Sequence, residues 1–214
     1  LAFLNDYFYI IDPADKDITV AEFYNEVDKI EKDLNIKIHT TTIDPYNELK
    51  HDLKDSNGRQ DLYIESMLGM CRRNAMKYNR HNCIITHCAD QKMITNNGFT
   101  YYPPPTAREY AGGQAWYRKG LAMIGVWRPP NGLPDETGRP AEDNEVHIII
   151  QKSKPKGVGK KGTAKLYFDL FHNRYYERLA DGTNKYSSEA KIMQPAQENR
   201  AIFASANYYE PDQF

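Results

Sequence analysis

Asp44 is the first residue whose type and position could do chemistry. It follows an isoleucine- and threonine-rich run in IHTTTIDPYNEL (38–49), and that run predicts a strand. Open α/β sheets bind ligands at the carboxyl ends of their strands, where a carboxylate can hold Mg²⁺ beside a phosphate. An aspartate before a proline is also a common turn or helix-capping residue. The pattern by itself leaves both roles open.

His87 stands near the end of the next apolar run, IITHC (84–88). If the two predicted strands are parallel neighbours, His87 lies beside Asp44 and could sense the terminal phosphate of a nucleotide. The alternative is a histidine that is satisfied within the core or at the surface. Zinc is disfavoured, because His81 and His87 lie too far apart along an extended chain to hold one ion.

A lysine cluster is the third candidate. Five lysines fall within ten residues of the segment QKSKPKGVGKK (151–161), beginning with Lys152 and Lys154. Such a loop could reach the phosphates of a neighbouring subunit or follow a nucleic-acid backbone. A solvated hairpin whose lysines only maintain solubility is the alternative for an isolated charge run.

The fourth candidate is the segment between residues 90 and 112, which we expect to be one long loop. Loops of this length in a compact domain are uncommon and often functional. Lys92 and Arg108 lie within it, and Gly112 and Gly113 follow at its end. A loop of this kind could bind nucleic acid, although an inert surface loop fits the same pattern.

The hydrophobic pattern indicates which elements would position these residues. The order strand, helix, strand, helix, strand is typical of an α/β fold with a parallel sheet and helical crossovers. A closing run of strands adds an antiparallel section. We expect helices at 18–34, 61–78 and 113–119, and strands at 7–12, 36–43, 83–88, 121–127, 145–152, 163–169 and 174–178.

Composition narrows the class of protein. The 214 residues carry a net charge of −1, so any nucleic-acid contact must come from a local cluster rather than from the whole chain. Three cysteines without paired spacing favour a reducing, cytoplasmic compartment. The sequence has no run of 18 apolar residues, so we expect no membrane span. One domain over residues 1–180 and a polar extension over 181–214 are the predicted organisation.

Five segments together carry a family resemblance. In chain order they are LNDYFYIID (4–12), IDPYNEL (43–49), IITHC (84–88), GGQAWYRKGLAMIGVWRP (112–129) and VHIIIQKSKPKGVGKKGTAKLYFDLFHNRYYE (146–177). They resemble the ring-shaped replicative DNA helicases, which include DnaB, the mitochondrial helicase Twinkle and the phage primase–helicases. Each motif is unspecific alone, but their shared order over residues 4–178 makes the resemblance stronger.

The resemblance implies a RecA-like P-loop NTPase core, a mostly parallel sheet with helices on both faces, that uses ATP and Mg²⁺. Asp44 would position the Mg²⁺ ion, and His87 would contact the γ-phosphate. Lys152 and Lys154 would reach into the active site of the neighbouring subunit. The family normally has arginine where Lys154 stands, and lysine keeps the charge but loses the planar bidentate fork.

The resemblance also implies partners. Residues 90–112 would line a central channel and hold single-stranded DNA, with contacts from Lys92, Arg108, Gly112 and Gly113. The chain would assemble into a ring, hexameric in this family, in a bacterial or phage-encoded system. The aromatic and acidic tail at 208–214 could dock on a replication polymerase or primase, although a loose terminus is the favoured alternative.

Two departures from the family qualify this interpretation. The phosphate-binding loop GxxxxGK[ST] does not occur in the 214 residues. The glutamate that activates water would lie on a strand before the first residue. We therefore expect an active ATPase in the parent protein and no activity in this chain by itself. The alternative is a RecA-like module that binds DNA or a ring partner without catalysis.

Overall fold

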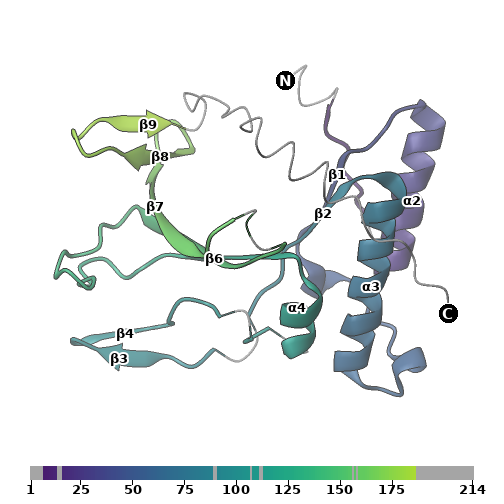
Figure 1. Cartoon of the computed structure of the whole chain (residues 1–214), viewed down its shortest axis with the longest axis horizontal. Helices are drawn as coiled ribbons and strands as arrows, with labels where there is room; N and C mark the ends of the chain where they lie inside the picture. The colour runs from purple at the N-terminus through teal and green to yellow at the C-terminus, as the bar shows by residue number, and fades with distance from the viewer. Residues whose placement is uncertain are drawn as a thin grey trace. The chain divides into compact units, whose positions relative to one another are not determined.

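The computed structural model describes residues 7–13, 16–88, 91–106, 108–110, 113–155, 157 and 159–186 (Figure 1). These residues form a mixed α/β fold whose strands lie in three separate sheets. By its internal contacts the chain divides into two units. The first takes in the described residues of Leu1–Trp127 with Ile148–Thr163, and the second those of Arg128–His147 with Ala164–Phe214.

Most helices and strands belong to the first unit. Its elements are α2 (Val20–Leu34), β1 (Thr40–Ile43), the short 3₁₀ helices η1 (Tyr46–Glu48) and η2 (Lys54–Ser56), α3 (Gln60–Tyr78), β2 (His81–Ile84), β3 (Ile94–Asn96), β4 (Phe99–Tyr101), α4 (Gln114–Lys119) and β5 (Ala122–Trp127). Strand β6 (Glu145–Ser153) runs from the second unit into the first. Strands β7 (Gly162–Asp169), β8 (Arg174–Arg178) and β9 (Asn184–Tyr186) follow, and β5 to β9 pair in sequence order.

Helix α2 confirms the prediction made for residues 18–34, and its two ends have clear causes. The Thr19 side chain accepts a hydrogen bond from the Glu22 backbone N–H, while the Glu22 carboxylate accepts one from the Thr19 backbone N–H. This capping box satisfies two donors that the first turn leaves unpaired. Asn35 ends the helix in the left-handed conformation, with φ of 51°.

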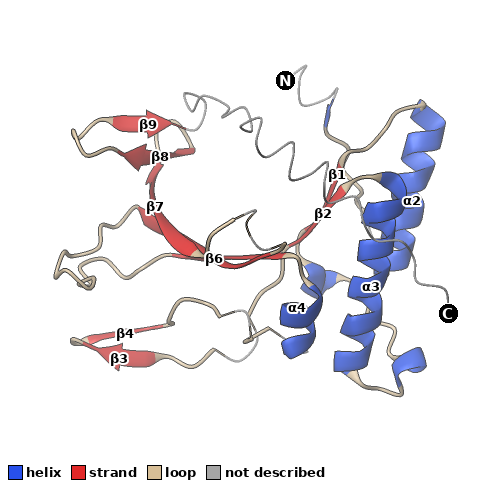
Figure 2. Cartoon of the chain, in the orientation of Figure 1, coloured by secondary structure: helices blue, strands red, loops and turns tan. Residues whose placement is uncertain are grey.

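Helices α2 and α3 lie side by side next to the β1–β2 pair (Figure 2). Their inner faces share one buried cluster, to which α2 contributes Val20 and Tyr24 and α3 contributes Ile64, Met67 and Cys71. The prediction of a helix at 61–78 is thereby confirmed. Because α3 connects β1 to β2, it is the helical crossover that parallel pairing of these strands requires.

Arg80 ties the end of α3 to α2. Its side chain is fully buried, and its guanidinium lies 2.8 Å from Glu31 and 3.4 Å from Asp28. The same group lies 4.3 Å from the centroid of the Tyr78 ring. A buried cation requires such partners, because its desolvation is otherwise uncompensated.

Three expectations about strands are corrected. Residues 8–13 form no strand, and Ile10 is 91% exposed; an apolar run becomes a strand only where a neighbouring edge pairs its backbone. The expected long loop at 90–112 contains the antiparallel hairpin β3–β4. Asn97 and Gly98 turn this hairpin with φ of 50° and 79°, the conformation that this dipeptide favours. Strand β9 lies beyond the predicted boundary at residue 180 and pairs with β8.

The single, mostly parallel sheet is not what the described residues form. Strands β1 and β2 make a two-stranded parallel sheet, in which Ile43 pairs with Ile84. The registers of β3–β4, β7–β8 and β8–β9 are antiparallel. After β2 the chain enters a hairpin and then α4, and the next strand, β5, pairs with β6 instead of extending the first sheet. The predicted antiparallel hairpin at 163–178 is confirmed as β7–β8.

The second unit holds a buried carboxylate. Glu145 is 1% exposed, with Oε1 lying 2.6 Å from His147 Nε2 and Oε2 accepting a hydrogen bond from Arg139 Nη2 at 2.6 Å. Burial raises the pKa of Glu145, but the hydrogen bonds from His147 and Arg139 outweigh burial, so its pKa lies below the ordinary value. This network fixes the start of β6.

We expect Arg80→Ala to destabilise the protein by about 3 kcal/mol, because it leaves the Glu31 carboxylate without its buried partner. Chemical denaturation would measure the change in the free energy of unfolding. Arg59→Ala is the matched control, because the Arg59–Asp61 pair is exposed and such pairs contribute little. Equal losses in both variants would contradict a special role for the buried arginine.

Candidate strand-end site and adjoining hollow

The strand-end site is the edge at which β1 and β2 terminate. Backbone pairing continues past both strands: the Ile85 N–H donates to the Ile43 carbonyl at 2.9 Å, and the Tyr46 N–H donates to the Ile85 carbonyl at 2.8 Å. Asp44 follows β1 directly and His87 follows β2 by three residues, and both side chains are exposed. The parallel register thus brings these two predicted site residues to one edge of the sheet.

Asn47 connects the two segments that follow the strands. Its Oδ1 accepts a hydrogen bond from Thr86 Oγ1 and another from the His87 backbone N–H, each at 2.9 Å. The motif IDPYNEL contains Asn47, but the sequence pattern alone assigns this residue no role. An amide side chain just after a strand-end aspartate is the signal that could have found it, because such side chains pair backbone groups in turns.

Tyr46 anchors the turn after β1 in the core. It is almost fully buried, stacks on His51 with ring centroids 4.4 Å apart, and meets Trp116 of α4 edge-on at 5.1 Å. Burial raises the pKa of the Tyr46 hydroxyl well above its ordinary value. A turn held at both Tyr46 and Asn47 presents Asp44 from a fixed backbone.

Lys152 has a structural role that the sequence did not predict. It is 5% exposed, and its Nζ donates hydrogen bonds to the carbonyls of Tyr117 and Arg118 at the end of α4. Burial, with a contribution from the nearby Lys154 charge, lowers the pKa of Lys152. A cation at this position satisfies carbonyls that the last helical turn leaves unpaired.

The other predicted basic and glycine residues are spread over the first unit. The side chains of Lys92, Arg108 and Lys154 are exposed. Gly113 directly precedes α4 with φ of 57°, a conformation that favours glycine. Gly112 lies outside the described residues. The structure therefore places Asp44 and His87 at the same end of the β1–β2 sheet. Among the described residues it records no contact that joins these two side chains to each other or to Lys92 or Lys154.

In the described part of the chain, no group of three or more histidine, cysteine or acidic side chains is placed to hold a metal ion. The three cysteines, which all fall within it, are unpaired thiols. Asp44 offers one exposed carboxylate, which suits Mg²⁺ because this ion keeps several waters and takes few protein ligands. No described helix is long and apolar enough to cross a membrane.

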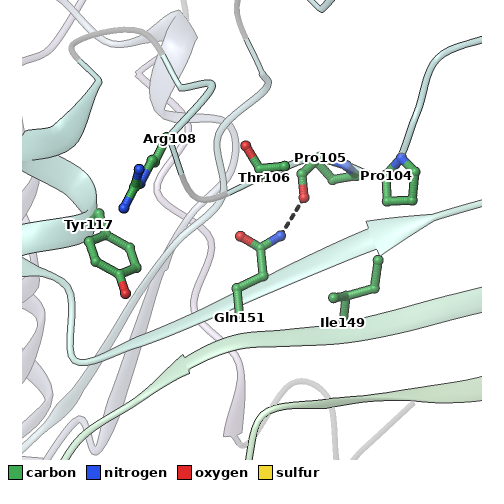
Figure 3. A pocket seen from close by; sticks show the side chains of 7 residues that line it. All are labelled: Pro104, Pro105, Thr106, Arg108, Tyr117, Ile149 and Gln151. Atoms are coloured by element: carbon green, nitrogen blue, oxygen red, sulfur yellow. Dashed lines mark hydrogen bonds between the residues drawn. The ribbon is translucent and has the colours of Figure 1, made fainter. Parts of the chain in front are cut away.

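A shallow hollow of about 330 Å³ lies beside α4 in the first unit (Figure 3). A proline-rich turn, the approach to α4, one α4 side chain and two β6 side chains line it: Pro104, Pro105, Thr106, Arg108, Tyr117, Ile149 and Gln151. Gln151 Nε2 donates a hydrogen bond to the Pro105 carbonyl. Gly125 makes room for this amide, since a Cβ there would lie only 2.7 Å from Gln151 Nε2.

Comparison with known proteins adds no family assignment. No protein-family model matches the sequence, and a search of curated proteins finds no match.

Asn47→Ala should release the segment after β2, because the His87 N–H loses its acceptor. We expect faster hydrogen exchange of the His87 amide and unchanged exchange of the Tyr46 amide, measured by NMR. Asn47→Asp keeps an acceptor oxygen and should retain the protection of His87. Unaltered His87 exchange in the alanine variant would show that the Asn47 bridge does not form in solution.

Lys152→Met should cost about 1–2 kcal/mol of unfolding free energy, because it removes the ammonium but keeps an apolar stem of similar length. Lys154→Met alters an exposed lysine two residues away and should leave stability unchanged. Thermal or chemical denaturation of the two variants checks this. If the Lys152 variant is as stable as the parent, the Lys152 ammonium does not stabilise the end of α4.

Proposed function

We propose that the protein is part of an ATP-dependent, ring-forming replicative DNA helicase with a RecA-like core, which moves along single-stranded DNA. The observation that carries this proposal is the parallel β1–β2 pair, whose carboxyl ends bring Asp44 and His87 to one edge. Ligands of α/β proteins bind at such edges. The five-segment resemblance supports the same function.

In this proposal Asp44 holds Mg²⁺ through water, and the ion neutralises charge on the nucleotide phosphates. His87 contacts the γ-phosphate. The hydrogen bond from its backbone N–H to Asn47 connects His87 to the turn that carries Asp44. Because phosphoryl transfer depends mostly on positioning and charge neutralisation, fixed backbone at these residues is the useful property.

Charge distribution supports a separate contact with DNA and with a neighbouring subunit. Lys154 is exposed and could reach the phosphates of a neighbour, whereas Lys92 and Arg108 are exposed in the segment between β2 and α4. With a net charge of −1, the chain would depend on such local cations to bind a phosphate backbone.

A second candidate function is a non-catalytic RecA-like module that binds DNA or a ring partner. The observation that favours it is Lys152, whose ammonium is bonded to the carbonyls of its own α4. In this arrangement Lys152 stabilises its own subunit, as expected for a module that serves as a scaffold.

Hydrolysis of ATP by the full-length gene product, with and without single-stranded DNA, distinguishes the two candidates. We expect DNA to stimulate hydrolysis and Asp44→Asn to reduce kcat by roughly 100-fold or more, because the metal supplies several kcal/mol of charge stabilisation. Asp33→Asn, which alters an exposed carboxylate on α2, should behave as the parent.

An intact protein that binds DNA but never hydrolyses ATP would favour the non-catalytic module. If Asp44→Asn hydrolyses ATP as fast as the parent, Asp44 does not hold the metal, although the protein is still an ATP-dependent motor.

A further inference from the structure

The hollow beside α4 has no part in the nucleotide chemistry proposed for the strand-end site. We propose that it binds one unpaired nucleobase together with the adjoining phosphate. Its lining combines an aromatic ring, apolar walls, a buried amide acceptor and an exposed guanidinium on a preformed surface. As a contact for single-stranded DNA, this inference deepens the proposed function and rests on it.

The aromatic and apolar lining suits the face of a base. The half-buried Tyr117 presents its ring to the hollow, and Pro104, Pro105 and Ile149 add apolar surface (Figure 3). Proteins hold unpaired bases by stacking them on such rings, since every base has a π face. A hollow of about 330 Å³ that opens to solvent admits a base still attached to its strand.

The amide of Gln151 supplies a fixed polar contact. Its Nε2 is engaged by the Pro105 carbonyl, which settles the orientation of the amide. Its Oε1 is buried and has no hydrogen-bond partner among the described residues, and in Figure 3 it points to the side where Arg108 and Tyr117 lie. An unpaired buried acceptor is costly, and an N–H group of an entering base would satisfy it.

The charges around the hollow favour a phosphate at its edge. The Arg108 guanidinium is exposed and lies 5.7 Å from the centroid of the Tyr117 ring, and the Lys152 ammonium lies 4.9 Å from that centroid. The neighbouring carboxylate of Glu109 opposes a phosphate, but it accepts a hydrogen bond from the Thr106 N–H at 2.8 Å.

The lining is held in place before any ligand arrives. Trp127 Nε1 donates to the Tyr102 carbonyl at 2.9 Å, and Gln91 Nε2 donates to the Pro103 carbonyl at 3.2 Å. With the Gln151–Pro105 bond, three side chains thus fix three carbonyls within the proline-rich turn. Preorganisation of this kind reduces the entropy that binding costs.

Binding of a fluorescein-labelled 20-mer of deoxyadenosine, and of an abasic strand of equal length, tests the inference without ATP turnover. We expect Tyr117→Ala to weaken binding of the deoxyadenosine strand by roughly 5- to 150-fold, the range that loss of one base stack produces. Tyr117→Phe keeps the ring and should bind as the parent. On the abasic strand, Tyr117→Ala and the parent should bind equally.

The phosphate contact has its own pair of variants. Arg108→Gln should weaken the binding of both strands. It should also lower the number of counterions released on binding, read from the salt dependence, by about one. Arg118→Gln is the control, because Arg118 lies on the same helix as Tyr117 but its guanidinium is paired with Glu65 at 2.6 Å. Competition by deoxyadenosine monophosphate shows whether the hollow takes a free nucleotide or a base within a DNA strand. If the free nucleotide displaces the strand in a Tyr117-dependent manner, the hollow is a nucleotide site. If it does not, the hollow is a site for a DNA strand.

Two results would overturn the inference: Tyr117→Ala binding as the parent, or the same loss on the abasic strand as on the deoxyadenosine strand. Failure of the helicase proposal looks different, because it appears as absent ATP hydrolysis in the intact protein while base-dependent binding at Tyr117 persists. Tyr117→Phe separates a lost stack from a damaged fold, since both variants keep the backbone carbonyl that Lys152 caps.

Discussion

Parallel pairing of β1 with β2 is the constraint on which the rest of the first unit depends. Parallel strands need a crossover, and α3 supplies it. The hydrogen bonds then continue beyond the strands, through Ile85 and Tyr46, so the turn after β1 folds over the end of β2. Buried backbone groups must be paired, and this requirement fixes where Asp44 and His87 emerge.

Helix α4 connects this edge to the hollow within the same unit. Trp116, on its inner side, meets Tyr46 of the strand-end turn, while Arg118 is paired with Glu65 of α3. Tyr117, between them in sequence, lines the hollow. A six-residue helix has little stability of its own, so its position is set by these contacts and by the lysine that caps its end. Helix α4 thus contacts the strand-end turn through Trp116 and lines the hollow through Tyr117.

The sequence predicted elements better than it predicted their pairing. Periodic apolar residues located α2 and α3. The prediction of a strand at 7–12 was wrong, because β-forming composition does not reveal whether a neighbouring strand is available to pair with it. Asn97–Gly98 carried a hairpin signal that the expectation of a long loop obscured. Strand order predicted that Asp44 and His87 stand at the same end of the sheet, and the parallel register agrees. The hydrogen bonds of the Asn47 side chain depend on how the two following segments pack, which no sequence pattern gives.

Lys152 and Lys154 show why residue type alone could not assign the lysine cluster. Both were expected to reach a neighbouring subunit, yet only Lys154 is exposed, and the Lys152 ammonium is bonded to two carbonyls of α4. For Lys152 to reach outward it must give up these bonds and leave the carbonyls at the end of α4 unpaired, which costs free energy. Lys154 bears no such cost. In the proposed ring, a contact between subunits through this segment would fall to Lys154, while Lys152 stays bonded to the end of α4.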